Sequence, residues 1–320
     1  MHSNHLSEMS LPLRYRLYAP IHRGFTALGH VTVAGKHPFI VLRNHLNRVM
    51  YRCVLTEQTH GTVLTRSGFR IRVPLGDQAA ASIVFERQYA PEESGLIRRL
   101  LSACDAFLDA GANLGYFSLL AHSVLEGRGV VITVEPNPCL CALIRESMAL
   151  NGYPSNTVWQ AGVGAAPGQA WFVVDPRRSS CGRIILEPDP AGTPVPVVRI
   201  DDLIAPQRLD LRWLIKIDVE GLEAQVIAGC TDAMARGAIF LCEVFATSAE
   251  QVQNTIRSQG YTLLDHRGMP LPAEVLRRKR RQDVIMVPAA RAEWLQHFLQ
   301  SRGKETEPSW SRRVTHHANQ

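Results

Sequence analysis

The sequence predicts an α/β fold: a mostly parallel sheet with helices on both faces and an antiparallel closing strand. Three observations lead to this prediction. Short, almost continuously apolar segments alternate with amphipathic helical segments between residues 91 and 288. The apolar segments have the length of strands and no polar face, as expected in a buried parallel sheet. The last two, 261–265 and 283–288, follow each other without a helical pattern, which favours an antiparallel hairpin.

The individual elements follow from this pattern in chain order. Strands are expected where apolar runs are bounded by turn residues, at 106–110, 130–135, 157–163, 213–219, 239–245, 261–265 and 283–288. Helices are expected where apolar residues recur at helical spacing, at 111–125, 137–152, 221–230 and 248–260. An insert with two further β segments, 170–174 and 195–200, separates the third strand from the fourth.

The pattern divides the chain into three parts. Residues 1–94 are predicted to form a β-rich N-terminal extension, because short β-type runs occur at 30–35, 39–44, 62–73 and 81–89. Residues 95–290 form the α/β domain. Residues 291–320 comprise an amphipathic helix, which is expected to pack on its own domain, and a polar tail.

Composition places the chain among folded proteins. It has 320 residues, of which 46% are hydrophobic and 20% charged, enough for a core without disulfides or metals. No run of about 18 apolar residues predicts a membrane span, and the N-terminus lacks the apolar stretch of a signal peptide. The seven cysteines are dispersed and form no CxxC pair, which predicts reduced thiols, no zinc site and a cytoplasmic location. The net charge of +6 does not establish nucleic-acid binding.

The sharpest motif is D-A-G-A-N-L-G, with Asp109, Gly111, Asn113 and Gly115, where a strand turns into a helix. Glycine there lets the backbone approach a ligand, and the helix start presents free N–H groups. Asp109 would repel a pyrophosphate but suits a ligand with a cationic amino-acid end. S-adenosylmethionine is such a ligand. The alternative interpretation is a plain strand–helix turn in which glycine serves packing.

Glu135 strengthens the cofactor interpretation. It ends the second strand, twenty positions after Gly115, where a carboxylate accepts hydrogen bonds from the two hydroxyls of a ribose. Asn137 follows as a predicted helix N-cap, and Asn137 and Asp218 are also candidate cofactor-binding residues. The alternative for Glu135 is a solvated carboxylate at a helix start.

A third group of charged residues follows the fourth strand. Alternation along the strand places Lys216, Asp218 and Glu220 on one face. Because burying unpaired charges is costly, these side chains are expected to bind a ligand or to pair with one another. Glu243 lies at the end of the next strand. Asp218, Glu220 and Glu243 are therefore the candidate general bases for an alcohol acceptor. His122 and His266 come second. No local motif supports a metal held by Asp218 and Glu243.

The sequence resembles the FkbM family of S-adenosylmethionine-dependent methyltransferases in FLDAGANLGYFSLL, VVITVEPNP, VVRIDDL, IKIDVEGLEAQVIAG and IFLCEVF, and in the lead-in QYAPEESGLIRRLL. The likeness covers residues 85–288. It implies the Rossmann-like class I methyltransferase fold and O-methylation of a sugar, glycan or small natural product. It also implies cofactor roles for Asp109, Gly111, Asn113, Gly115 and Glu135 and an active-site position for Asp218. About the first 80 residues and the tail lie outside the likeness, so substrate choice is not transferred.

Three other functions compete with this one. A nucleic-acid methyltransferase is less favoured because IDVE stands where the motif for exocyclic amines would follow the fourth strand. The G-x-N-x-G spacing and Asp109 disfavour a nicotinamide oxidoreductase. A non-catalytic binding protein of the same fold stays open.

The basic run Arg277–Arg281 is predicted to be a solvated loop face, with an anion site as the alternative.

Overall fold

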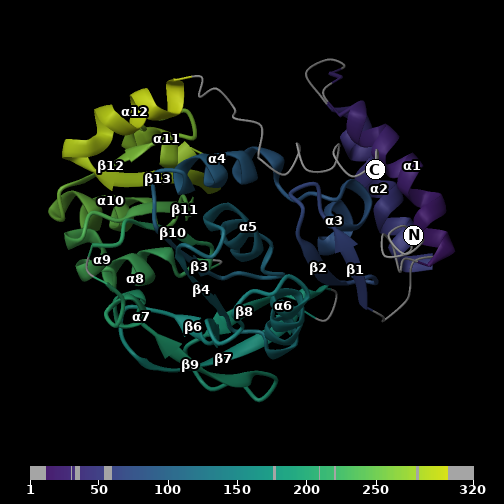
Figure 1. Cartoon of the computed structure of the whole chain (residues 1–320), viewed down its shortest axis with the longest axis horizontal. Coiled ribbons are helices and arrows are strands. Elements are labelled where there is room, and N and C mark those ends of the chain that lie inside the picture. Colours follow the sequence, from purple (N-terminus) through teal and green to yellow (C-terminus); the bar gives the residue numbers. More distant parts are fainter. Residues whose placement is uncertain are drawn as a thin grey trace, which may run out of the picture.

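The computed structural model describes residues 12–29, 31–32, 37–53, 60–175, 178–208, 210–219, 221–278 and 281–301. Its strands form a seven-stranded central sheet, a four-stranded sheet beside it and a two-stranded hairpin (Figure 1). No helix in these ranges is long and apolar enough to cross a membrane.

The central sheet confirms the predicted strands. Its members, in chain order, are β3 (Ala106–Ala110), β4 (Val130–Glu135), β5 (Val158–Gln160), β10 (Trp213–Ile217), β11 (Ile239–Phe245), β12 (Tyr261–Leu264) and β13 (Arg281–Pro288). They lie in the order β12-β13-β11-β10-β3-β4-β5. The five strands from β11 to β5 run parallel, and β13 runs antiparallel to both β11 and β12. The predicted antiparallel closing strand is therefore present.

Helices cover both faces of this sheet (Figure 1). One layer consists of α4 (Pro91–Leu101), α5 (Tyr116–Leu125), α6 (Pro138–Leu150) and α12 (Ala292–Gln300), the last following a short 3₁₀ turn, η2 (Ala289–Arg291). The other consists of α7 (Ile200–Ile204), α8 (Glu223–Ala228), α9 (Thr231–Ala235), α10 (Ala249–Ser258) and α11 (Ala273–Arg278). Neighbouring strand residues such as Phe107 and Leu108 belong to opposite cores, as strand alternation requires.

Two details near the C-terminus refine the prediction. The short helix α11 lies between β12 and β13, where no helix was expected, because six residues are too few to show helical spacing. The C-terminal helix α12 packs on its own domain, as predicted, and buries Leu295 and Leu299.

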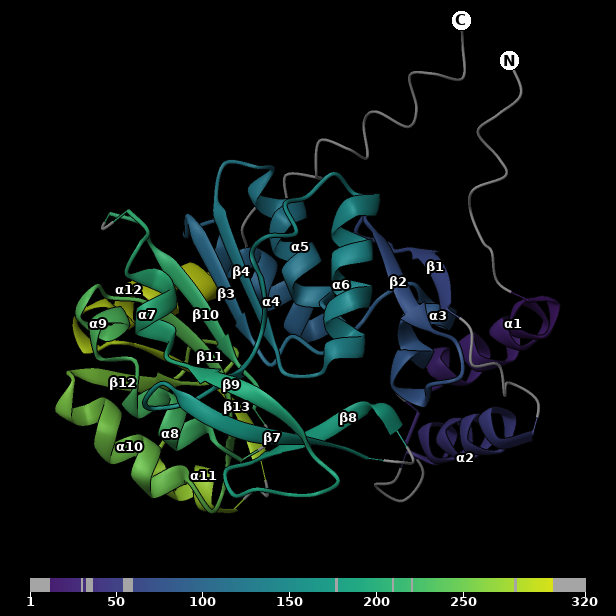
Figure 2. The same cartoon turned by 90° about the horizontal axis from the view of Figure 1, so that it is seen from below.

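The insert forms the four-stranded sheet, which projects from the parallel strands (Figure 2). Its strands are β6 (Gly162–Val163), β7 (Gly168–Asp175), β8 (Arg178–Ile185) and β9 (Thr193–Val198), in the order β6-β9-β7-β8. The strand expected at 157–163 is thus divided between two sheets. Its first half, β5, pairs with β4, and its second half, β6, pairs with β9.

The N-terminal extension is mainly helical, so the prediction of a β-rich extension was wrong. It contains α1 (Leu13–Ala27), α2 (Pro38–Cys53), the hairpin β1 (His60–Leu64) and β2 (Arg70–Pro74), the 3₁₀ turn η1 (Gln78–Ala80), and α3 (Ala81–Glu86). Only the run at 62–73 forms strands. The runs at 39–44 and 81–89 fall in α2 and α3, because short apolar runs look alike in buried strands and in helices. The run at 30–35 lies mostly outside the described residues.

Candidate active site

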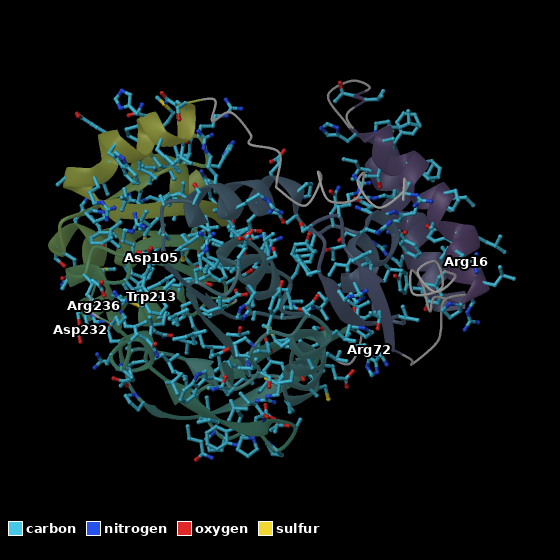
Figure 3. All side chains as sticks on the ribbon, in the orientation of Figure 1. Arg16, Arg72, Asp105, Trp213, Asp232 and Arg236 are labelled. Atoms are coloured by element: carbon cyan, nitrogen blue, oxygen red, sulfur yellow. The ribbon has the colours of Figure 1, made fainter. Side chains whose placement is uncertain are left out.

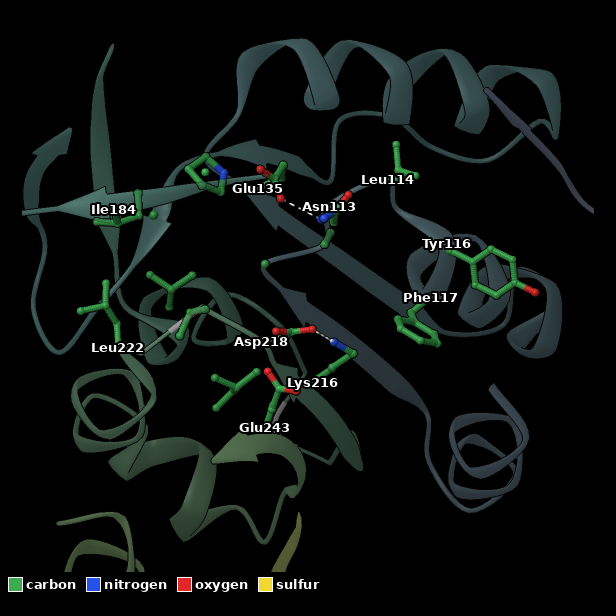
Figure 4. A pocket seen from close by; sticks show the side chains of 18 of the residues that line it. Asn113, Leu114, Tyr116, Phe117, Glu135, Ile184, Lys216, Asp218, Leu222 and Glu243 are labelled. Atoms are coloured by element: carbon green, nitrogen blue, oxygen red, sulfur yellow. Dashed lines mark hydrogen bonds and ion pairs between the residues drawn. The ribbon is translucent and has the colours of Figure 1, made fainter. Parts of the chain in front are cut away.

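A cavity of about 400 Å³ opens at the carboxyl ends of β3, β4 and β10, on the side where the insert sheet lies (Figure 4). Carboxyl ends of parallel strands are the expected ligand site of such a sheet, and the volume suits a small-molecule ligand. Its wall includes Gly111, Asn113, Glu135, Asp218 and Glu243 from the central sheet. The insert and α3 complete the wall, through Phe172, Ile184 and Ile83.

The glycines of the first motif have distinct structural reasons. Gly111 has a φ of +82°, and a Cβ there would overlap the carbonyl oxygen of Asp218. Only glycine therefore allows the β3 loop to pass so close to the end of β10. Gly115 has a φ of +74° and caps α5, and a Cβ there would press on the side chain of Ile144. Gly111 lines the cavity, whereas Gly115 supports the turn from behind.

Glu135 is held by the backbone of two loops. Its carboxylate accepts one hydrogen bond from the Asn113 N–H at 2.7 Å and another from the Asn137 N–H at 2.9 Å. Asn113 adopts a φ of +52°, a conformation that asparagine tolerates better than most residues. Burial raises the pKa of Glu135 to about 7, against the lowering effect of these two hydrogen bonds. A carboxylate has about four acceptor sites, so Glu135 can still accept hydrogen bonds from ligand hydroxyls.

Besides Gly115, two of the predicted cofactor residues lie behind the cavity wall. Asp109 is fully buried and accepts a hydrogen bond from the Ser118 hydroxyl at 2.7 Å, which links β3 to α5. Burial raises its pKa, against the opposing effect of Lys216. The Asn137 side chain accepts a hydrogen bond from the Cys139 N–H at 3.0 Å and caps α6, as predicted. Direct contact of Asp109 or Asn137 with a cofactor stays a prediction.

Lys216 is the buried centre of a charged cluster on the opposite side of the cavity. Its Nζ lies 2.9 Å from Asp218 Oδ2 and 3.8 Å from Glu93 Oε1, and 5.0 Å above the Phe117 ring centre (Figure 4 shows the first of these contacts). Burial lowers the pKa of Lys216, but Asp218, Glu93 and Asp109 more than offset this and raise it overall. Lys216 therefore remains a cation, and the expected pairing on this strand face is present.

Glu93 is a cavity residue that the sequence did not single out. It lies in the first turn of α4, and burial raises its pKa to about 7 while Lys216 opposes the rise. Its signal was weak, because adjacent acids after a proline are common at helix starts. Only the folded structure, in which α4 packs on α5 and Glu93 lies 3.8 Å from Lys216, shows that Glu93 reaches the cavity and that its exposed neighbour Glu92 does not.

The remaining predicted bases are distributed unevenly. Glu243 lines the cavity, and its Oε1 lies 3.3 Å from Nε of Arg281. Glu220 lies outside the described residues. His122 is buried against Tyr153, its pKa lowered to about 4 by burial, and neither it nor His266 lines the cavity.

The basic run is not simply a solvated loop face. Arg281 belongs to β13 rather than to a loop and lines the cavity beside Glu243, while 59% of its side chain stays exposed to solvent. Arg277 ends near Glu250, with 3.7 Å between Nη2 and Oε2. The side chains of residues 278–280 lie outside the described part of the chain.

The methyltransferase FkbM domain model matches residues 109–263, from the glycine motif to β12. The chain carries a methyltransferase FkbM domain. This confirms the resemblance, and the sheet described above is the Rossmann-like class I methyltransferase sheet that it implied. The methyl donor of this domain is S-adenosylmethionine.

Solved structures with a similar fold include methyltransferase FkbM from Methylobacillus flagellatus, at 16% identity and a TM-score of 0.39. That match covers 67% of this chain and 53% of the other, so the chain spans about half the length of this relative. An O-methyltransferase from Bacillus cereus in complex with SAH matches at 12% identity and a TM-score of 0.35, covering 62% of this chain and 81% of the other. Among curated proteins, none matches.

The residues of the cavity fit S-adenosylmethionine. The β3 loop is shaped so that backbone, and no side chain, borders the cavity at Gly111. Glu135 is buried and borders the cavity, so its carboxylate would be able to accept hydrogen bonds from a ribose diol. Gly111, Asn113 and Glu135 would hold the cofactor, which supplies an electrophilic methyl group.

Proposed function

We propose that the FkbM domain transfers the methyl group of S-adenosylmethionine to a hydroxyl of a small-molecule or glycan acceptor. The observation that supports this most is the position of Glu93, a carboxyl group with a pKa of about 7 in the same cavity as Glu135. An alcohol must lose its proton as it accepts a methyl group. A base that is ionised near neutral pH, and whose side chain is only 25% exposed, meets that need.

Each residue then has a separate task. Glu135 and the β3 loop bind the cofactor, and Glu93 takes the proton of the acceptor hydroxyl. Lys216 stays charged and keeps part of the Glu93 population ionised, since its charge opposes the rise in the Glu93 pKa. Asp218 orients Lys216 through their 2.9 Å contact. Glu243, together with Arg281, is placed to orient the acceptor. Glu220 remains a prediction from the sequence.

The test compares Glu93→Gln with Glu92→Gln, a matched change on the exposed side of the same helical turn. Turnover is measured as release of S-adenosylhomocysteine with a panel of sugar, glycan and alcohol acceptors. We expect Glu93→Gln to lower turnover by roughly 10²–10⁴-fold at unchanged cofactor affinity, because a general base is lost. Glu92→Gln should behave like the parent.

The pH dependence gives a second readout. Protonated Glu93 accepts no proton, so parental turnover should fall as the pH drops below about 7. Parental turnover in Glu93→Gln would refute the role of Glu93. Methyl transfer to nucleic acid and to none of the hydroxyl acceptors would refute O-methylation.

We also propose a cytoplasmic location, because the described cysteines Cys104, Cys139, Cys141, Cys230 and Cys242 carry free thiols.

A further inference from the structure

The helix α1 has two apolar faces, and only one of them is covered. Tyr15, Tyr18 and Ala19 are buried against the rest of the extension. On the opposite side, Leu13, Leu17 and Ile21 are 66%, 66% and 52% exposed. Their four-residue spacing places them in one stripe along the helix. A protein that is stable alone gains nothing from such a stripe in water.

The second helix continues the pattern. On α2, Val41, Leu42 and Val49 are also exposed. Figure 1 shows that α1 and α2 lie together at one end of the molecule, far from α10 and α12. We call these two helices the N-terminal helix pair. Together they present six exposed aliphatic side chains, a clustering that usually marks an interaction surface.

The charge of the N-terminal helix pair has one sign. Residues 13–53 contain no Asp or Glu and seven basic residues: Arg14, Arg16, Arg23, Lys36, Arg43, Arg48 and Arg52. Because the whole chain carries +6, the remainder carries −1. Arg16 and Arg23 are exposed and flank the aliphatic stripe of α1, and Figure 3 shows Arg16 on the outer side of that helix. The positive excess of the protein is therefore concentrated in this segment.

The helix pair is docked firmly on the domain. Tyr15, Tyr18 and Tyr51 all pack around Phe85 of α3, and Arg43 forms an ion pair of 3.5 Å with Glu86. The neighbouring Ile83 on α3 lines the candidate active site. The N-terminal helix pair is thus connected to the wall of the candidate active site through the short helix α3.

We propose that the N-terminal helix pair binds the surface of an anionic lipid bilayer. Aliphatic side chains enter the boundary between headgroups and acyl chains, and flanking arginines contact the anionic headgroups. A second copy of this chain fits less well, because it would bring arginines against arginines with no acid on either helix. Nucleic acid would contact the arginines but would leave the leucines in water. This inference does not depend on the acceptor of methyl transfer.

The test is flotation of the full chain with vesicles of phosphatidylcholine alone or with about one-third phosphatidylglycerol. We expect binding to the anionic vesicles that weakens as salt is raised. The triple variant Leu13→Ser, Leu17→Ser, Ile21→Ser should lose at least tenfold in partitioning, because less apolar area enters the bilayer. Arg16→Gln with Arg23→Gln should lose at least tenfold as well, at about fivefold per arginine.

Matched controls change exposed residues elsewhere. Leu150→Ser with Leu186→Ser removes aliphatic groups, and Arg128→Gln with Arg257→Gln removes charge, both away from the helix pair. These variants should bind like the parent. In a separate variant, Leu17→Trp, brominated lipid should quench the fluorescence of the introduced tryptophan. This measurement detects insertion directly and needs no variant that has lost binding.

Four results would overturn the proposal. The parent fails to float with anionic vesicles, or the triple variant floats as well as the parent. Sedimentation shows a dimer that the triple variant loses, which makes a second copy the occupant. Alternatively, the helix pair binds RNA or DNA with an affinity that the serine changes leave intact.

Discussion

The pKa of Glu135 leads to a prediction about both cofactor binding and stability. Burial holds this pKa at about 7, whereas an exposed glutamate titrates near 4.5. The difference corresponds to about 3 kcal/mol of unfavourable free energy when the carboxyl group is ionised in the free protein. Because the folded state keeps its proton more tightly, this contribution to stability is fully present below pH 4.5. It is lost as the pH rises to about 7 and above.

Cofactor binding should have the opposite pH dependence. The two ribose hydroxyls donate hydrogen bonds, so they favour the ionised form of Glu135. Affinity for S-adenosylmethionine should therefore weaken below about pH 7, by up to about tenfold per pH unit. Glu135→Gln should bind roughly 10- to 150-fold more weakly at pH 8, the loss expected for a hydrogen bond to a charged group. Its affinity should also vary little between pH 6 and pH 8.

Calorimetric titrations at pH 6, 7 and 8, with urea unfolding at the same pH values, measure both effects. Glu146→Gln is the matched control, because Glu146 lies on the neighbouring helix α6 and is exposed. Glu93→Gln is a second control, since it should retain the pH dependence of cofactor affinity. The reasoning is refuted if Glu135→Gln binds as tightly as the parent, or if parental affinity is the same at pH 6 and pH 8.

Two further predictions concern the loop and the charged cluster. Gly111→Ala should lower both the melting temperature and cofactor affinity, because the methyl group displaces the backbone at Asp218. Gly127→Ala, which has a similar φ of +73° but open space around it, should show only the strain of a left-handed residue, about 1–2 kcal/mol. Asp218→Asn should weaken the apparent affinity for the cofactor, because Asp218 lines the cavity beside the β3 loop at Gly111. Turnover at saturating cofactor should stay within about tenfold of the parent, because Asp218 acts on the base Glu93 through Lys216. A loss of turnover that persists at saturation and reaches roughly a thousandfold would instead make Asp218 the base.

The sequence predicted β3, β4 and β11 of the central sheet well because these strands are largely buried. The ranges 106–110, 130–135 and 239–245 coincide with β3, β4 and β11. Buried strands leave an uninterrupted apolar run whose ends are marked by turn residues. The helices of the extension left no such mark. In α2, the run 39–44 looks like a strand, and the polar residues that follow do not mark one solvent face, because Arg48 is exposed whereas Asn47 is buried.

Half of the site was predictable because parallel strand ends meet at one edge. Glu135, Asp218 and Glu243 end adjacent or near-adjacent strands, and the structure brings them to one cavity. Asp109 also follows this rule, but it lies in register with Lys216 inside the sheet rather than at its edge. Its orientation depends on Ser118 of α5, which a motif does not reveal.

The other half depends on packing between distant segments. Glu93 reaches the cavity from a helix that precedes the sheet, and Arg281 reaches it from the last strand of the chain. Neither position carries a local pattern that separates it from an exposed charge. The pKa of Glu93 is likewise set by what covers it, and burial is a property of the assembled fold.

Calorimetry of the parent protein can decide whether the cavity at the ends of β3 and β4 binds S-adenosylmethionine with Glu135 as the ribose acceptor. The ligands are S-adenosylmethionine, S-adenosylhomocysteine, NAD and NADP, under identical conditions. We expect one binding event per chain for the two sulfur-containing nucleosides, weakened roughly 10- to 150-fold in Glu135→Gln, and no heat from either dinucleotide. Binding of NAD or NADP, or of S-adenosylmethionine with undiminished affinity in Glu135→Gln, would contradict this assignment.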